Sequence, residues 1–73
     1  SAHREIRRAQ VIAAAATTPE MAAEMYLASI LVVDEENFME RAYLQELAKQ
    51  LRLAPELQTE LSNQAKNAIQ LCN

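Results

Sequence analysis

Apolar residues recur at helical spacing through most of the chain. Between residues 2 and 16, Ile6, Ala9 and Ala13 follow one another at intervals of three and four residues, which places them on one face of a helix. Two later segments show the same periodicity, with apolar positions at Tyr43, Leu44, Leu47, Ala48 and Leu51 in one and at Leu57, Leu61, Ala65, Ala68, Ile69 and Cys72 in the other. With the intervening apolar segment, the pattern predicts helices at about residues 2–16, 19–33, 38–52 and 55–71.

Capping residues and prolines mark where these segments begin. Thr18 is suited to cap a helix whose first position is Pro19, because the missing N–H of proline has no partner there in any case. Pro55 occupies the equivalent place before the last segment. Asn37, followed three residues later by Glu40, resembles a capping box with asparagine in place of serine or threonine.

The composition favours helices over strands. The chain has no glycine, and glycine is the favoured residue of the tight turns that join antiparallel strands. The connections between the segments are short, so neighbouring helices are expected to pack antiparallel. We therefore predict an all-α fold, in which four short antiparallel helices form a small bundle, as a single domain over residues 1–73 or as part of a larger domain.

The second segment is the most apolar. Residues 25–33 carry no charge on any side, and a helix that is apolar all round belongs in a protein interior. Nine residues fall short of the ~20 that cross a bilayer, so no direct membrane insertion is expected. Because so short a chain can hardly surround a central helix by itself, we predict a homodimer. A marginal monomer with an exposed apolar patch stays open as the alternative.

An acidic cluster is the clearest candidate for chemistry. Asp34, Glu35, Glu36 and Glu40 offer the oxygen ligands that calcium and magnesium prefer, although the glycine and the alternating spacing of an EF-hand are missing. Glu40 also shares the apolar side of its helix, where a carboxylate needs a partner. The alternative is that Glu40 closes the cap at Asn37 while the other three carboxylates favour a helix N-terminus.

Other polar residues suggest little chemistry. His3 with Arg4, Arg7 and Arg8 makes the start of the chain basic, but the net charge is −3 and there is no tryptophan, so we expect a solvated face and no nucleic-acid partner. Cys72 has no histidine nearby in sequence, and we interpret it as a small hydrophobic residue. No nucleophile–base set or phosphate loop occurs; hence neither an enzyme nor a cofactor is predicted.

Several strings together are similar to a known family. They are Thr18-Pro19-Glu20, Ala22 to Ser29, Val33-Asp34, and Phe38-Met39-Glu40-Arg41-Ala42-Tyr43-Leu44. Over about residues 17–65 the chain resembles the C-terminal part of the uncharacterised bacterial YebE-like inner-membrane proteins. These are a branch of the tellurite-resistance (TerB-like) helical superfamily.

The resemblance implies a larger helical bundle of which this chain holds the later helices, roughly half. The partner of the apolar helix would then be the N-terminal half of its own protein, preceded by a membrane-associated region, with this part soluble and on the cytoplasmic side. The superfamily's acidic motif suggests divalent-metal binding, and here only Asp34 and Glu40 fall where a degenerate copy would lie. We therefore expect a non-enzymatic helical interaction module, with a divalent-cation or stress-response sensor that uses residues 34–40 as the alternative.

Overall fold

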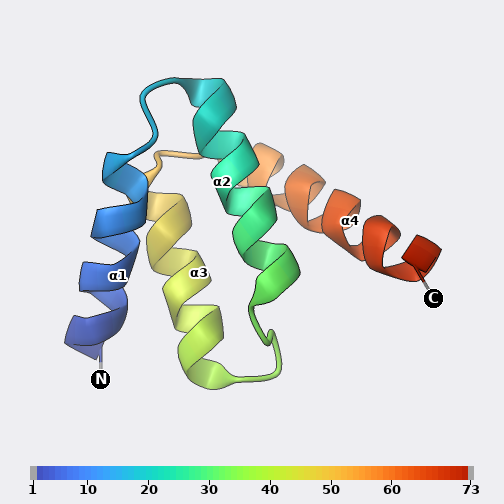
Figure 1. The fold of residues 1–73 in the computed structure, drawn as a ribbon, viewed down its shortest axis with the longest axis horizontal. Helices are drawn as coiled ribbons and strands as arrows, with labels where there is room; N and C mark the ends of the chain where they lie inside the picture. Colours follow the sequence, from blue (N-terminus) through green and yellow to red (C-terminus); the bar gives the residue numbers. More distant parts are fainter. Residues whose placement is uncertain (1, 73) are drawn as a thin grey trace.

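Four helices make up most of the chain in the computed structural model, which describes residues 2–72 and the side chains of residues 3–71. They are α1 (Ala2–Ala14), α2 (Pro19–Val32), α3 (Phe38–Gln50) and α4 (Pro55–Cys72) (Figure 1). No strand occurs within residues 2–72. The all-α fold is thus confirmed, and the predicted helix ends differ from these bounds by at most two residues.

Local signals set the helix boundaries. The Thr18 hydroxyl accepts a hydrogen bond from the Met21 N–H at 3.1 Å, and the Asn37 side chain accepts from the N–H groups of Met39 and Glu40. These bonds satisfy donors that the first turn of a helix leaves free. Helix α1 ends early because its last bonds tighten: the N–H of Ala16 reaches the carbonyl of Ala13 rather than that of Ile12.

Helix α3 ends with a residue in the left-handed region. Arg52 has a φ of 59°. Its N–H donates to the Lys49 carbonyl, and the next N–H, of Leu53, donates back to Ala48, both at 3.1 Å. This pair of bonds is the Schellman ending, which usually has glycine at the left-handed position. The chain has no glycine, so an arginine takes this place.

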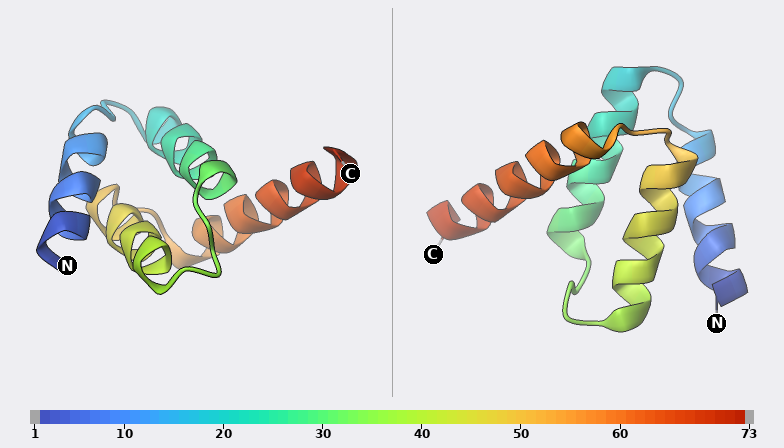
Figure 2. Two further views of the ribbon diagram at one scale, coloured as in Figure 1. Left: turned by 60° about the horizontal axis from the view of Figure 1, so that its bottom comes forward. Right: turned by 180° about the vertical axis from the view of Figure 1, so that it is seen from behind.

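The helices do not pair in chain order. Helices α1, α2 and α3 run alternately up and down in Figure 1, as predicted, but α1 packs mainly against α3, to which it is parallel. Helix α4 leaves the top of α3, crosses α2 and extends beyond the other helices (Figure 2). The alanine-rich face of α1 permits the close approach to α3, since Ala9 at the contact is 0% exposed.

The core lies around α3 rather than around α2. Leu47 of α3 is fully buried, and the buried cluster comprises Ala9, Tyr26, Ile30, Tyr43, Leu44, Leu47, Ala48, Leu61 and Ala65. The predicted core positions of α3 are buried except Leu51, which is half-buried. The expectation that α2 is the central helix is wrong for a single copy of the chain, because neighbours contact only part of its circumference.

Candidate interaction surface

Helix α2 has a second apolar face that is largely exposed, although Met25 on it is half-buried and the Thr17 hydroxyl contacts Met21 Sδ at 3.1 Å. Its buried face carries Ala22, Tyr26 and Ile30, at intervals of four residues. On the other side lie Met21, Met25, Ala28 and Val32, at intervals of four, three and four residues, and we call these four residues the α2 seam. Val32 is 81% exposed and Met21 is 39% exposed. Intervals of three and four are the spacing with which a helix meets a partner helix.

The charged residues near this seam in sequence are all acidic. Residues 17–40 contain six acidic residues and no lysine or arginine. Glu20 and Glu24 lie on the exposed side of α2, and Asp34, Glu35 and Glu36 follow in the exposed loop to α3. The exposed flank of α2 therefore combines an apolar stripe with a negative border, which favours a partner with apolar and positive groups.

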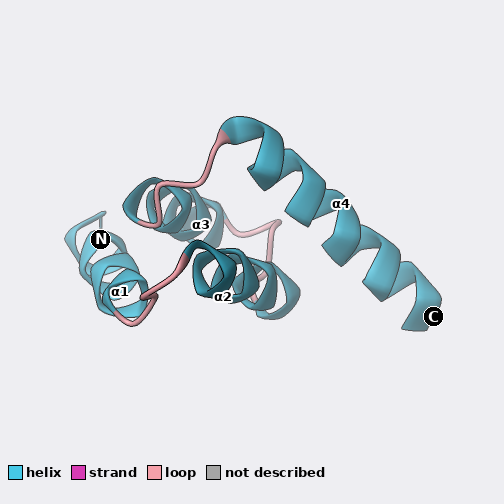
Figure 3. Ribbon diagram, turned by 90° about the horizontal axis from the view of Figure 1, so that it is seen from above, coloured by secondary structure: helices cyan, strands magenta, loops and turns pink. Residues whose placement is uncertain are grey.

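The end of α4 exposes another part of a predicted apolar stripe. Leu61 and Ala65 are buried against the bundle, but Ala68 is exposed and Ile69 is 48% exposed. Leu71, which the predicted stripe did not include, is 88% exposed. Figure 3 shows why: α4 runs away from the other three helices toward its C-terminal end. The prediction of one continuous buried stripe thus holds only for its first half. The side chain of Cys72 lies outside the described residues.

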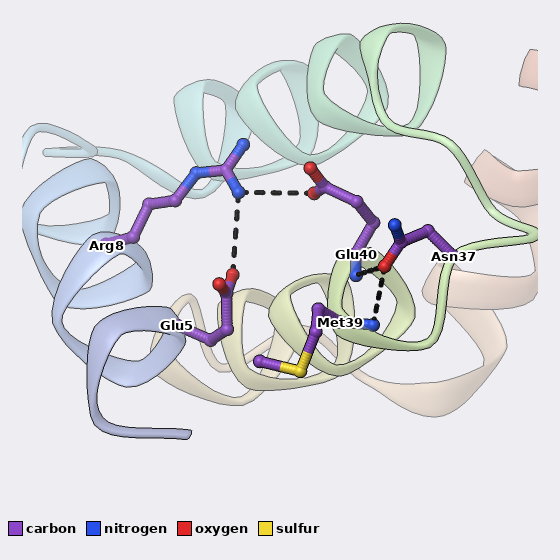
Figure 4. A network of polar contacts seen from close by, with 5 residues as sticks. All are labelled: Glu5, Arg8, Asn37, Met39 and Glu40. Atoms are coloured by element: carbon purple, nitrogen blue, oxygen red, sulfur yellow. Dashed lines mark hydrogen bonds and ion pairs between the residues drawn. The ribbon is translucent and has the colours of Figure 1, made fainter. Parts of the chain in front are cut away.

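Arg8 connects α1 to α3 through Glu40. Its Nη1 donates to Glu40 Oε2 at 3.2 Å and approaches Glu5 Oε2 at 3.5 Å, as drawn in Figure 4. The guanidinium carbon also lies 4.0 Å from the centre of the Tyr43 ring, within the range of a cation–π contact. The expectation that Glu40 needs a partner on its apolar side is met by this arginine.

The structure disperses the four predicted metal ligands. Asp34 Oδ1 accepts from the Glu36 N–H at 3.0 Å, the Glu35 carbonyl accepts from Arg41 Nη1, and the Glu40 carboxylate meets Arg8. Within the described part of the chain, no three His, Cys, Asp or Glu residues are grouped so that they would hold a metal ion. Glu40 does not complete the capping box either, because the Asn37 N–H donates to the Asp34 carbonyl instead.

The outer side of α1 is basic and partly apolar. Arg4, Arg7 and Val11, at intervals of three and four residues, are all exposed, and Val11 is 67% exposed. Arg4 and Arg7 were expected on a solvated face and lie on one, whereas Arg8, expected there too, contacts Glu40 and Tyr43. Sequence reasoning did not single out Val11, although its place one turn after Arg7 is the signal that an apolar contact belongs to the same face.

Tyr26 lies where α2 meets α4. Burial raises the pKa of its hydroxyl above the ordinary 10.0, the nearby Ser62 hydroxyl partly offsets this rise, and the negative charge of Glu35 adds to it. The ring is 6% exposed. A buried tyrosine of this kind packs with its apolar body and keeps its hydroxyl neutral at ordinary pH.

An open hollow of about 450 Å³ lies between the loop that joins α1 to α2 and the corner that joins α3 to α4. Its walls are formed mostly by alanine and leucine, with Thr17, Thr18 and Gln50 as the uncharged polar residues. Among the lining residues, Arg52 alone carries a charge, and a guanidinium stays protonated. This lining has hydroxyl groups but no carboxylate, imidazole or thiol that would activate them.

Comparison with known proteins places the chain in a family. A family model described as a protein of unknown function (DUF533) matches residues 4–65, and the chain belongs to that family, which is part of the TerB-like group. The match includes most of α1, which the sequence resemblance did not place, and it ends at Ala65, the last residue of α4 that is buried within residues 3–71. The searches of curated proteins and of solved structures found no match. No helix within residues 2–72 is long and apolar enough to cross a membrane.

Proposed function

We propose that this chain is a non-enzymatic helical interaction module that associates with a second copy of itself through the α2 seam. The observation that carries the proposal is the pair of apolar faces on α2. Tyr26 and Ile30 are buried by this chain, whereas Val32 and Met21 on the opposite side are exposed. A helix that is apolar on both faces is stable in water when both are covered.

A small core supports the same proposal. Among residues 3–71, ten hydrophobic residues are buried, and four of the ten are alanine. Alanine buries little apolar area, so the folded monomer gains little from its own core. Covering Met21, Leu31 and Val32, each at least 39% exposed, would add to this modest stabilisation. Symmetric dimers are the commonest way for a small chain to gain such cover.

The biological setting that we propose follows from the likeness to YebE-like proteins. The module would be the part of a bacterial inner-membrane-associated protein that lies outside the bilayer, on the cytoplasmic side. The family match over residues 4–65 supports the wider relationship. In this setting the module brings two copies of the membrane protein together without chemistry of its own.

A substitution in the seam tests the proposal. Ala28 is exposed in the middle of the seam, and glutamate there keeps a good helix former while it places a charge in the interface. In sedimentation equilibrium, Ala28→Glu is expected to weaken dimerisation at least about tenfold, because the longer side chain overpacks the helix contact and its carboxylate loses water. The matched control is Asn63→Glu, at an exposed position on α4.

The controls decide what the result means. Asn63→Glu should dimerise as the unmodified chain does, and circular dichroism should show the same helix content for both variants. Equal dimerisation of Ala28→Glu and the unmodified chain would refute the role of the seam. A chain that stays monomeric throughout would refute self-association altogether.

A further inference from the structure

We infer that the partner surface for the α2 seam is the outer face of α1 in the second copy, in a symmetric dimer in which each basic α1 covers the other copy's acidic flank. This inference rests on the proposed function and names its interface. It accounts for two exposed faces at once: the apolar and acidic flank of α2, and the basic face of α1 that ends at Val11.

The two faces match in spacing. On α1, Arg4, Arg7 and Val11 lie on one exposed stripe, and Val11 is seven residues after Arg4. On α2, Met25 and Val32 are also seven residues apart. Seven residues of helix span about 10.5 Å in both cases. When Val11 of one copy packs on Met25 of the other in antiparallel fashion, Arg4 reaches the level of Val32, beside the acidic loop.

The two faces also match in charge. Residues 1–16 contain three arginines and one glutamate, whereas residues 17–40 contain six acidic residues and no basic one. Arg8 is engaged within its own copy by Glu40, which leaves Arg4 and Arg7 on the exposed side of α1. Opposite charges across an interface fix its register and select the partner.

The directions of α1 and α2 suit a two-fold axis. The N-terminal end of α1 and the loop from α2 to α3 lie at the same end of the molecule (Figure 1). Viewed from above, α2 lies between α1 and α4 (Figure 3). A two-fold axis parallel to these helices therefore lays each α1 antiparallel on the other copy's α2, with Arg4 next to Glu35 and Glu36 and Arg7 about one helical turn further from the acidic loop.

Charge reversal on each face tests the pairing. The double variant Arg4→Glu/Arg7→Glu sets like charges against the acidic loop, and Glu35→Arg/Glu36→Arg sets like charges against α1. We expect each variant alone to dimerise at least about tenfold more weakly than the unmodified chain, measured by sedimentation equilibrium at low salt. Mixed in equal amounts, the two should form a heterodimer of restored affinity, because both contact sets are then again attractive.

A matched variant controls for overall charge. Lys49→Glu/Lys66→Glu changes two exposed cations in the same way but away from both faces, and it should dimerise like the unmodified chain. Circular dichroism establishes that every variant is folded. Asp34 is left unchanged because its carboxylate stabilises the loop through the Glu36 N–H.

Each further outcome has a distinct meaning. If the unmodified chain dimerises and neither charge reversal weakens it, the α1 pairing is wrong while the proposed function stands. If the unmodified chain stays monomeric, the proposed function and the pairing both fail. If it stays monomeric and binds phosphatidylglycerol vesicles, and Arg4→Glu/Arg7→Glu abolishes that binding, the basic face serves a membrane surface and not a second copy.

Discussion

Arg8 and Glu40 join the first and third helices across a separation of 32 residues, with Arg8 Nη1 donating to Glu40 Oε2 at 3.2 Å. The same guanidinium covers the face of Tyr43, which is 3% exposed. One side chain thus supplies a long-range ion pair and shields a core aromatic ring from water. This relationship fixes α1 against the first turn of α3.

Replacing Arg8 should measure that contribution. The side chain is 44% exposed and that of Glu40 is 29% exposed, so the ion pair and the cation–π contact together are expected to stabilise the fold by about 1 kcal/mol. Arg8→Met should lower Tm by roughly 4–8 °C, with Lys66→Met as a control that changes it little. In a double-mutant cycle with Glu40→Gln, a coupling energy near zero would show that the pair is not stabilising.

Arg52 offers a stabilising substitution. A left-handed backbone costs an L-residue about 1–2 kcal/mol. Glycine avoids this cost, but it loses more conformational entropy on folding, which is worth about 0.5–1 kcal/mol. Arg52→Gly is therefore expected to raise the free energy of unfolding in urea by roughly 0.5–1 kcal/mol. Arg52→Ala, which keeps the β-carbon, should change it less. Lower stability of the glycine variant would contradict the left-handed assignment at this position.

The buried Tyr26 predicts a loss of stability at high pH. Because burial raises the pKa of its hydroxyl, the unfolded chain loses this proton above about pH 10 while the folded chain still holds it. Over that interval the folded state binds more protons, so stability falls as pH rises. Urea denaturation of the unmodified chain and of Tyr26→Phe between pH 8 and pH 11 checks this. Above about pH 10 the free energy of unfolding of the unmodified chain should fall relative to that of Tyr26→Phe. A constant difference between the two free energies would exclude a raised pKa.

Calcium should leave the melting temperature unchanged. The carboxylates of Asp34 and Glu40 already accept hydrogen bonds, from the Glu36 N–H and from Arg8. A cation bound by residues 34–40 would have to compete with Arg8 for the Glu40 carboxylate. Calcium at about 10 mM, above the dissociation constants of weak protein sites, should shift Tm no more than an equal ionic strength of sodium chloride. A specific rise would support a cation sensor instead.

The fold was predictable where signals are local. Thr18, Pro19 and Asn37 carry the chemistry of helix starts in their own side chains, and each begins a helix where expected. The pairing of α1 with α3 was not predictable, because periodicity tells which side of a helix is apolar but not which helix will cover it. The left-handed backbone of Arg52 was not predictable either. The usual sequence signal for such a helix end is a glycine, and this chain has none.

The candidate site was predictable only in part. The uncharged run from Met25 to Val33 predicted that α2 is buried on every side. A single chain buries only the side that carries Tyr26 and Ile30. The acidic residues were visible as a cluster in sequence, whereas their dispersal depends on Arg8, far away along the chain. Contacts between distant segments decide whether neighbouring carboxylates act together.

Light scattering of the unmodified chain over a range of concentrations tests the central claim most directly. From about 1 µM to about 1 mM, which brackets association free energies of roughly −8 to −4 kcal/mol, the mass should rise from the monomer's 8.2 kDa toward twice that value. A mass that stays at 8.2 kDa at every concentration would contradict self-association through α2.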